Sequence, residues 1–68
     1  MNKIIPSLNI LRVFAVAANH LSFKQAAQEL FISPPAVSHQ IRVLEKQLGI
    51  KLFVRLNRSL ELTSQGKD

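Results

Sequence analysis

The side chains of this sequence best suited to catalysis are a serine followed directly by a histidine, Ser38 and His39, and a second histidine, His20. A histidine can activate a serine only within hydrogen-bonding reach, and neighbouring side chains on a helix do not face each other. The histidines are nineteen residues apart, with no cysteine and no nearby acidic cluster to complete a metal site. The sequence therefore predicts a protein that is not an enzyme and has no metal site and no cofactor.

The other chemistry available to these side chains is the binding of anions. Nine Lys and Arg residues against four Asp and Glu give a formal net charge of +5, and the pI is about 10.5. A balance of this kind favours a polyanionic partner, either a nucleic acid or an anionic membrane surface. The absence of cysteine excludes disulfides and thiolate chemistry.

The stretch SPPAVSHQIRVLEKQLG, residues 33–49, predicts a helix that positions several polar side chains. Ser33 suits the N-cap, and Pro34 and Pro35 suit the first turn, where backbone N–H groups have no helical partner. Gly49 suits the left-handed stop. Apolar residues recur at Val37, Ile41, Leu44 and Leu48. The opposite face carries Pro35, His39, Arg42 and Lys46, with Ser38 on its flank and no acidic residue. An ordinary solvated surface helix can have such a face, so this stretch does not decide the function.

Two further helices are predicted before it. The first runs from about Leu8 to Asn19 after a cap at Ser7, and it is apolar nearly all round. One face has Leu8, Leu11, Phe14, Ala15 and Ala18, and another has Ile10, Val13 and Ala17. Such a helix is typically central in a bundle or covered by a partner. The second begins after Ser22, with an inward stripe of Phe23, Ala26, Ala27 and Leu30 and with Lys24, Gln25 and Gln28 facing outward.

The short connection Phe31–Ser33, with small residues at the helix crossing, favours a helix-turn-helix. The alternative is a helical hairpin of an ordinary small bundle, because Phe31 replaces the glycine often seen in this turn. The following stretch KLFVRLNRSLELT changes to a period of two, with Leu52, Val54 and Leu56 alternating against Phe53 and Arg55, and Leu60 and Leu62 alternating around Glu61. It predicts a hairpin whose tip is Asn57, Arg58 and Ser59.

The expected fold is therefore mainly α: a three-helix winged helix-turn-helix with a small two-stranded β-hairpin wing. With 68 residues, 47% of them apolar, the chain is expected to form one small domain. The first twenty residues superficially resemble a secretory signal, but Pro6, Asn9 and Arg12 interrupt the apolar run. No stretch approaches the about 18 apolar residues of a membrane span. Of the two polyanionic partners, a nucleic acid is expected and a membrane is not.

These features resemble the N-terminal DNA-binding domain of LysR-type transcriptional regulators and, within that family, the glycine-cleavage activator subgroup. The resemblance is carried by the segments LRVFAVAANHLSFKQAAQEL, SPPAVSHQIRVLEKQLGIKLF and RLNRSLELTSQG. The resemblance implies a DNA-binding domain over residues 1–63, with recognition helix 34–48 in the major groove. It implies that the wing, 52–62, lies on the adjacent backbone or minor groove. The positions that the family presents to DNA are Lys24, Gln25, Ser33, Pro34, Pro35, Ser38, His39, Arg42, Arg55 and Arg58.

Two positions depart from the pattern, because many members have glutamine in place of Pro34 and arginine in place of His39. A proline side chain cannot hydrogen-bond a base edge, and an imidazole lacks the bidentate fork of arginine, so less direct readout is expected there.

The resemblance also implies what a full-length regulator would contain. Residues 64–68 would start a truncated linker helix, which in the family forms a homodimer or tetramer. An effector-binding domain for a small molecule would follow, and the protein would act on double-stranded DNA in the cytoplasm.

An alternative function is a protein-interaction fragment that pairs with a full-length regulator. It is suggested by the apolar first helix together with Ile4 and Ile5.

Overall fold

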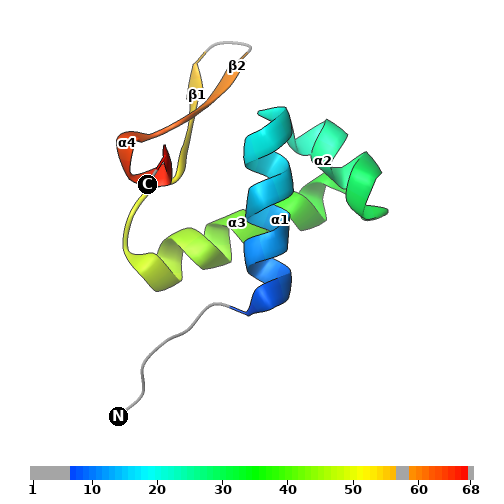
Figure 1. Cartoon of the computed structure of the whole chain (residues 1–68), viewed down its shortest axis with the longest axis horizontal. Coiled ribbons are helices and arrows are strands. Elements are labelled where there is room, and N and C mark those ends of the chain that lie inside the picture. Colours follow the sequence, from blue (N-terminus) through cyan, green and yellow to red (C-terminus); the bar gives the residue numbers. More distant parts are fainter. Residues whose placement is uncertain (1–6, 57–58, 68) are drawn as a thin grey trace.

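Three helices and an antiparallel hairpin, followed by one short helical turn, make up the part of the chain that the computed structural model describes, residues 7–56 and 59–67. In chain order the elements are α1 (Leu8–His20), α2 (Phe23–Leu30), α3 (Pro34–Leu48), β1 (Phe53–Leu56), β2 (Ser59–Leu62) and α4 (Ser64–Lys67). In Figure 1 α1 crosses α3, α2 lies beside both at one end, and the hairpin extends to one side of the helices. The expected fold class is confirmed.

The three long helices begin with the same device, a serine N-cap. The hydroxyls of Ser7, Ser22 and Ser33 accept hydrogen bonds from the backbone N–H three residues further on, at 3.1, 3.1 and 3.2 Å. Pro34 and Pro35 occupy the first two positions of α3. All three caps and both prolines lie where the sequence predicts them.

The same three helices end at residues in the left-handed backbone region: Leu21, Phe31 and Gly49, with φ of 51°, 60° and 71°. At Phe31 the turn is closed by the N–H of Ile32, which donates to the carbonyl of Ala27 at 3.1 Å. A side chain in this region costs roughly 1 kcal/mol or more. The α2–α3 turn is therefore made without glycine, by a phenylalanine that is 94% exposed.

The core forms where α3 meets the other helices. Its α3 members are Val37, Ile41 and Leu44, joined by Ile10, Val13, Ala17, Ala26, Ala27, Leu52 and Phe53. The prediction that the apolar stripe of α3 continues to Leu48 is wrong, because this side chain is 45% exposed. Leu48 is the last residue of α3, one turn beyond Leu44, and the buried part of the helix has ended there.

Helix α1 is buried on one side only within the described residues. Ile10, Val13 and Ala17 are in the core, and Phe14 and Ala18 pack against it. Leu8, Leu11 and Ala15 are exposed, at 87% and 42% for the two leucines. One face of α1 is thus packed in the core and the other is exposed within the described residues; cover of that second face by a partner stays a prediction.

The hairpin pairs Phe53 with Leu62 and Leu56 with Ser59, as an antiparallel two-stranded sheet. The alternation in the sequence does not indicate which face of the hairpin is buried; in the structure Leu52 and Phe53 are both buried, and Val54 is 41% exposed. Phe53 turns inward because two rings receive it edge-on, Phe14 at 5.6 Å and Phe23 at 5.4 Å between centroids. At the predicted tip, Asn57 and Arg58 lie outside the described residues, and Ser59 begins β2.

In the described part of the chain, no helix combines the length and the apolar character needed to cross a membrane.

Candidate nucleic-acid interface

Helix α3 presents two chemically different faces. Val37, Ile41 and Leu44 are at most 2% exposed. The opposite face exposes Pro35, His39, Arg42 and Lys46 to solvent, with Ser38 half-buried at its edge. Burial of the apolar stripe fixes the rotation of the helix about its axis, so the polar face must point outward.

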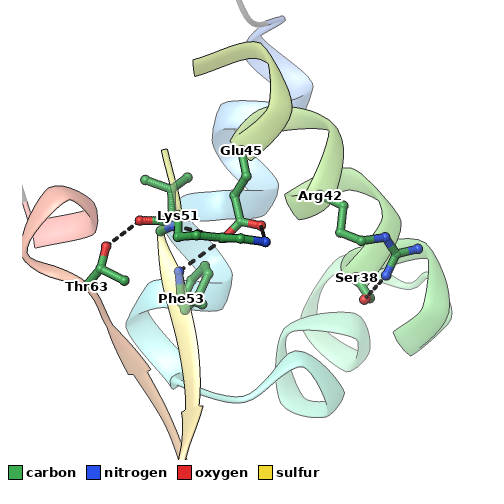
Figure 2. Close-up of polar contacts among 7 residues, drawn as sticks. Ser38, Arg42, Glu45, Lys51, Phe53 and Thr63 are labelled. Carbon is green, nitrogen blue, oxygen red and sulfur yellow. Dashed lines mark hydrogen bonds and ion pairs between the residues drawn. The ribbon is translucent and has the colours of Figure 1, made fainter. Parts of the chain in front are cut away.

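On that outer face, Arg42 and Ser38 are hydrogen-bonded to each other. The guanidinium Nη1 of Arg42 donates to Oγ of Ser38 at 2.8 Å, across one helical turn (Figure 2). The Ser38 hydroxyl is thus engaged by Arg42 and not by its neighbour His39, as the sequence spacing predicts.

The first turn of α2 adds a second group of polar side chains. Lys24 and Gln25 are exposed there, directly after the Ser22 cap. Lys24 also lines an open groove between α2, the start of α3 and the wing, together with Leu21, Ser22, Phe23, Pro34, Arg55, Ser59, Leu60 and Glu61. The structure therefore brings Lys24, Pro34 and Arg55 to one groove.

Arg55 is placed by the aromatic cluster beneath the wing. Its guanidinium carbon lies 5.9 Å from the centroid of the Phe23 ring, a cation–π contact, and the side chain is exposed. Arg55 is thereby held over the N-terminal end of α2. The other wing arginine predicted to bind DNA, Arg58, lies outside the described residues.

Glu45 is a residue of this region that the sequence reasoning missed. Its carboxylate Oε2 accepts the backbone N–H groups of Leu52 at 2.9 Å and Phe53 at 3.3 Å (Figure 2). The side chain is 11% exposed, and the Lys51 ammonium lies 4.0 Å from its other oxygen. Glu45 thus joins α3 to the start of the wing. The sequence feature that could have indicated its partial burial is its position on the helix wheel, one turn after Ile41 and at the margin of the apolar stripe.

Thr63 secures the other end of the hairpin. Its hydroxyl donates to the carbonyl of Lys51, and its backbone N–H donates to the carbonyl of Leu52 at 3.0 Å. The same hydroxyl accepts the N–H of Gly66 at 3.0 Å and so caps α4. A Cβ at Gly66 would lie 2.4 Å from the Leu52 carbonyl oxygen, so glycine permits this close packing.

Within residues 7–56 and 59–67, no three His, Cys, Asp or Glu side chains gather as a metal site would require. His20 is the last residue of α1, one residue beyond the predicted end at about Asn19, and its Nε2 lies 2.7 Å from a carboxylate oxygen of Glu29 in α2. That partner comes from the packing of α2 on α1 and is not apparent from sequence spacing.

The tight turn between α2 and α3, the exposed polar face of α3 and the hairpin that follows it define a winged helix-turn-helix domain. Residues 8–67 match the family model described as bacterial regulatory helix-turn-helix protein, lysR family. The chain belongs to this family.

Similar proteins agree with this assignment. The chain is 61% identical over 67 residues to the glycine cleavage system transcriptional activator of Escherichia coli, covering 98% of this chain and 22% of that protein. It thus spans about a fifth of the length of that relative, a transcriptional regulator by name. The fold is similar to a crystal structure of the BenM DNA-binding domain with catB site 1 DNA, with a TM-score of 0.85, 39% identity and coverage of 90% and 68% of the two chains. Oxidized OxyR of Corynebacterium glutamicum gives a TM-score of 0.89 and 35% identity, over 97% of this chain and 21% of that one.

Proposed function

We propose that this chain is a sequence-specific binder of double-stranded DNA, with α3 in the major groove and the wing on the adjacent backbone or minor groove. The observation that carries the proposal is the charge of the exposed face of α3. Glu45, the one acidic residue of this helix, turns its carboxylate toward the backbone of the wing. The outward face consequently has basic and neutral polar groups that suit the acceptors of DNA.

Distinct roles are proposed for the candidate contacts. Lys24, Arg55 and Arg58 contact phosphate or the minor groove, which sets affinity and register. Ser38, His39 and Arg42 lie one to two turns into α3, on the side of the helix that is proposed to face base edges. The remaining candidates are Gln25, Ser33, Pro34 and Pro35 at the starts of α2 and α3. Pro34 and Pro35 suit a close approach of the start of α3 to DNA, because a proline has no backbone N–H that would be left without a partner there. The similar BenM DNA-binding domain, 39% identical, is crystallised with DNA, which supports a DNA-binding role for this chain.

The regulatory setting is also a proposal. Residues 1–63 form the DNA-binding domain, and 64–68 begin a linker helix whose start Thr63 caps. In a full-length regulator, we propose that this helix forms the homodimer or tetramer and that a further domain binds a small-molecule effector. The protein then controls transcription in the cytoplasm and catalyses no reaction.

A second function rests on the exposed apolar side chains of α1, Leu8 and Leu11; Ile4 and Ile5, which also suggest it, lie outside the described residues. A chain with this surface could pair with a full-length regulator through α1 and leave DNA untouched. A protein-interaction module of this kind would not need the basic residues that α2, α3 and the wing expose, and these residues therefore favour DNA binding over the second function.

The test is selection from a random duplex library, followed by fluorescence anisotropy with the selected duplex at several salt concentrations. Three phosphate contacts, from Lys24, Arg55 and Arg58, predict that log affinity falls against log salt with a slope of about −3. A single chain should bind weakly, because paired half-sites are engaged together only by a dimer. Enrichment of no sequence, with binding only to a full-length regulator, would favour the second function.

A further inference from the structure

The hydrogen bond between Ser38 and Arg42 changes what α3 can recognise. An arginine on a helix surface ordinarily samples many rotamers, but here Nη1 is tied to the Ser38 hydroxyl at 2.8 Å. The ion pairs among residues 7–56 and 59–67 are His20 with Glu29 and Lys51 with Glu45, so no carboxylate draws Arg42 away. The guanidinium is therefore held beside the first half of α3, on its exposed face (Figure 2).

The bond also fixes which hydrogen-bonding groups the pair has left to offer. The Ser38 oxygen accepts from Arg42, so the hydroxyl proton remains available as a donor. Arg42 has five N–H groups and no acceptor, and one of the five is used by Ser38. Together the two side chains present an arrangement dominated by donors, with the planar fork of the arginine at its centre.

Guanine is the base whose major-groove edge has two adjacent acceptors, N7 and O6, whereas adenine places an amino donor beside its N7. We infer that Arg42 reads a guanine in the DNA site and that Ser38 is the positioning residue that holds the arginine fork for it. The inference rests on the proposed function, and it names one feature of the DNA sequence that this chain should prefer. A phosphate has acceptors too, and contact between Arg42 and a phosphate is the alternative that the experiment must distinguish.

The experiment uses the selected duplex and a set of duplexes in which each guanine in turn is replaced by adenine or by 7-deazaguanine, which lacks the N7 acceptor. The variants are Arg42→Lys, which keeps the charge without the fork, Ser38→Ala, Ser38→Thr, and Lys46→Ala as a control on the same face. Circular dichroism checks that each variant folds. Affinities are measured by fluorescence anisotropy at one low salt concentration and then across a salt series.

The chain should prefer guanine by about tenfold or more at one position, the discrimination expected of a bidentate contact. Arg42→Lys and Ser38→Ala should both reduce this preference at that same position. Ser38→Thr should retain it, because its hydroxyl can still accept from Arg42. Lys46→Ala should leave the preference unchanged. The double variant Ser38→Ala/Arg42→Lys should lose no more than Arg42→Lys alone, because the serine acts through the arginine.

Two results would overturn the inference while the proposed function stands. Equal losses by Arg42→Lys on every duplex would assign Arg42 to phosphate, and losses at different positions for the two single variants would show that Ser38 acts independently. If the unaltered chain enriches no duplex from the library, the proposed function fails and the inference fails with it.

Discussion

Helix α3 and the wing share one hydrophobic core, but the wing is held by a polar contact as well. Helix α3 is fixed by three buried apolar side chains, Val37, Ile41 and Leu44, against α1 and α2. The wing is joined to the helices by the Glu45 carboxylate and by the ring of Phe53. The wing shares the nonpolar core through Leu52 and Phe53, but it also depends on a carboxylate that acts through two directed hydrogen bonds. Removing this carboxylate should therefore loosen the wing without unfolding the helices.

The largest effect is expected from Leu44→Ala, because this side chain is 1% exposed and its removal leaves a cavity in the core. The free energy of unfolding should fall by about 2–5 kcal/mol, a large fraction of the stability of so small a domain. Urea denaturation followed by circular dichroism measures it. Leu48→Ala is the matched control on the same helix, 45% exposed, and should cost less than about 1 kcal/mol. Equal losses in the two variants would show that burial does not fix α3.

A smaller and more local effect is expected from Glu45→Ala. Removing the carboxylate leaves the N–H groups of Leu52 and Phe53 without their partner, at a cost of about 1–3 kcal/mol. Hydrogen exchange of these two amides should accelerate more than exchange of the Ile41 amide in the core of α3.

Lys51→Met separates the contribution of the Lys51 ammonium to stability from that of the Glu45 carboxylate beside it. The Lys51 side chain is 81% exposed and its ammonium lies 4.0 Å from the carboxylate, so its removal should change the free energy of unfolding by less than about 1 kcal/mol. For Glu45→Ala, an equal acceleration of hydrogen exchange in α3 and in the wing would contradict the prediction that the wing can loosen while the helices stay folded.

The smallest effect on stability is expected from Arg55→Ala, because the exposed Arg55 side chain contributes one cation–π contact. The free energy of unfolding should fall by no more than about 1 kcal/mol. Affinity should fall by a similar factor on all duplexes, and the salt slope should become shallower by about one. Arg12→Ala removes an equal charge from the exposed surface of α1 and should leave both unchanged. A loss confined to particular base pairs would assign Arg55 to base readout.

Much of the fold follows from local signals in the sequence. The caps at Ser7, Ser22 and Ser33, the prolines of α3 and the stop at Gly49 are each set by a few neighbouring residues, and all lie where predicted. The exposed and buried faces of α3 follow from helical periodicity in the same way, up to Leu44. Such features need no knowledge of the rest of the molecule.

The remaining features depend on contacts between distant residues. The burial of Phe53 depends on Phe14 and Phe23, which together provide a site for its ring. Glu45 binds the backbone of a segment seven residues away, and no helical pattern indicates that partner. The roles of the ten candidate DNA-binding residues stay predictions, since they concern a partner, and Arg58 in addition lies outside the described residues.

A titration of the chain with its selected duplex, followed by backbone amide chemical shifts, shows whether α3 and the wing together form a DNA-binding surface. The largest changes are expected at Lys24, at Ser38 to Arg42 and at Arg55, with little change at Leu8, Leu11 and Ala15 on the exposed side of α1. The largest changes on that side of α1, with the amides of α3 and β1 unmoved, would contradict a DNA-binding surface made of α3 and the wing.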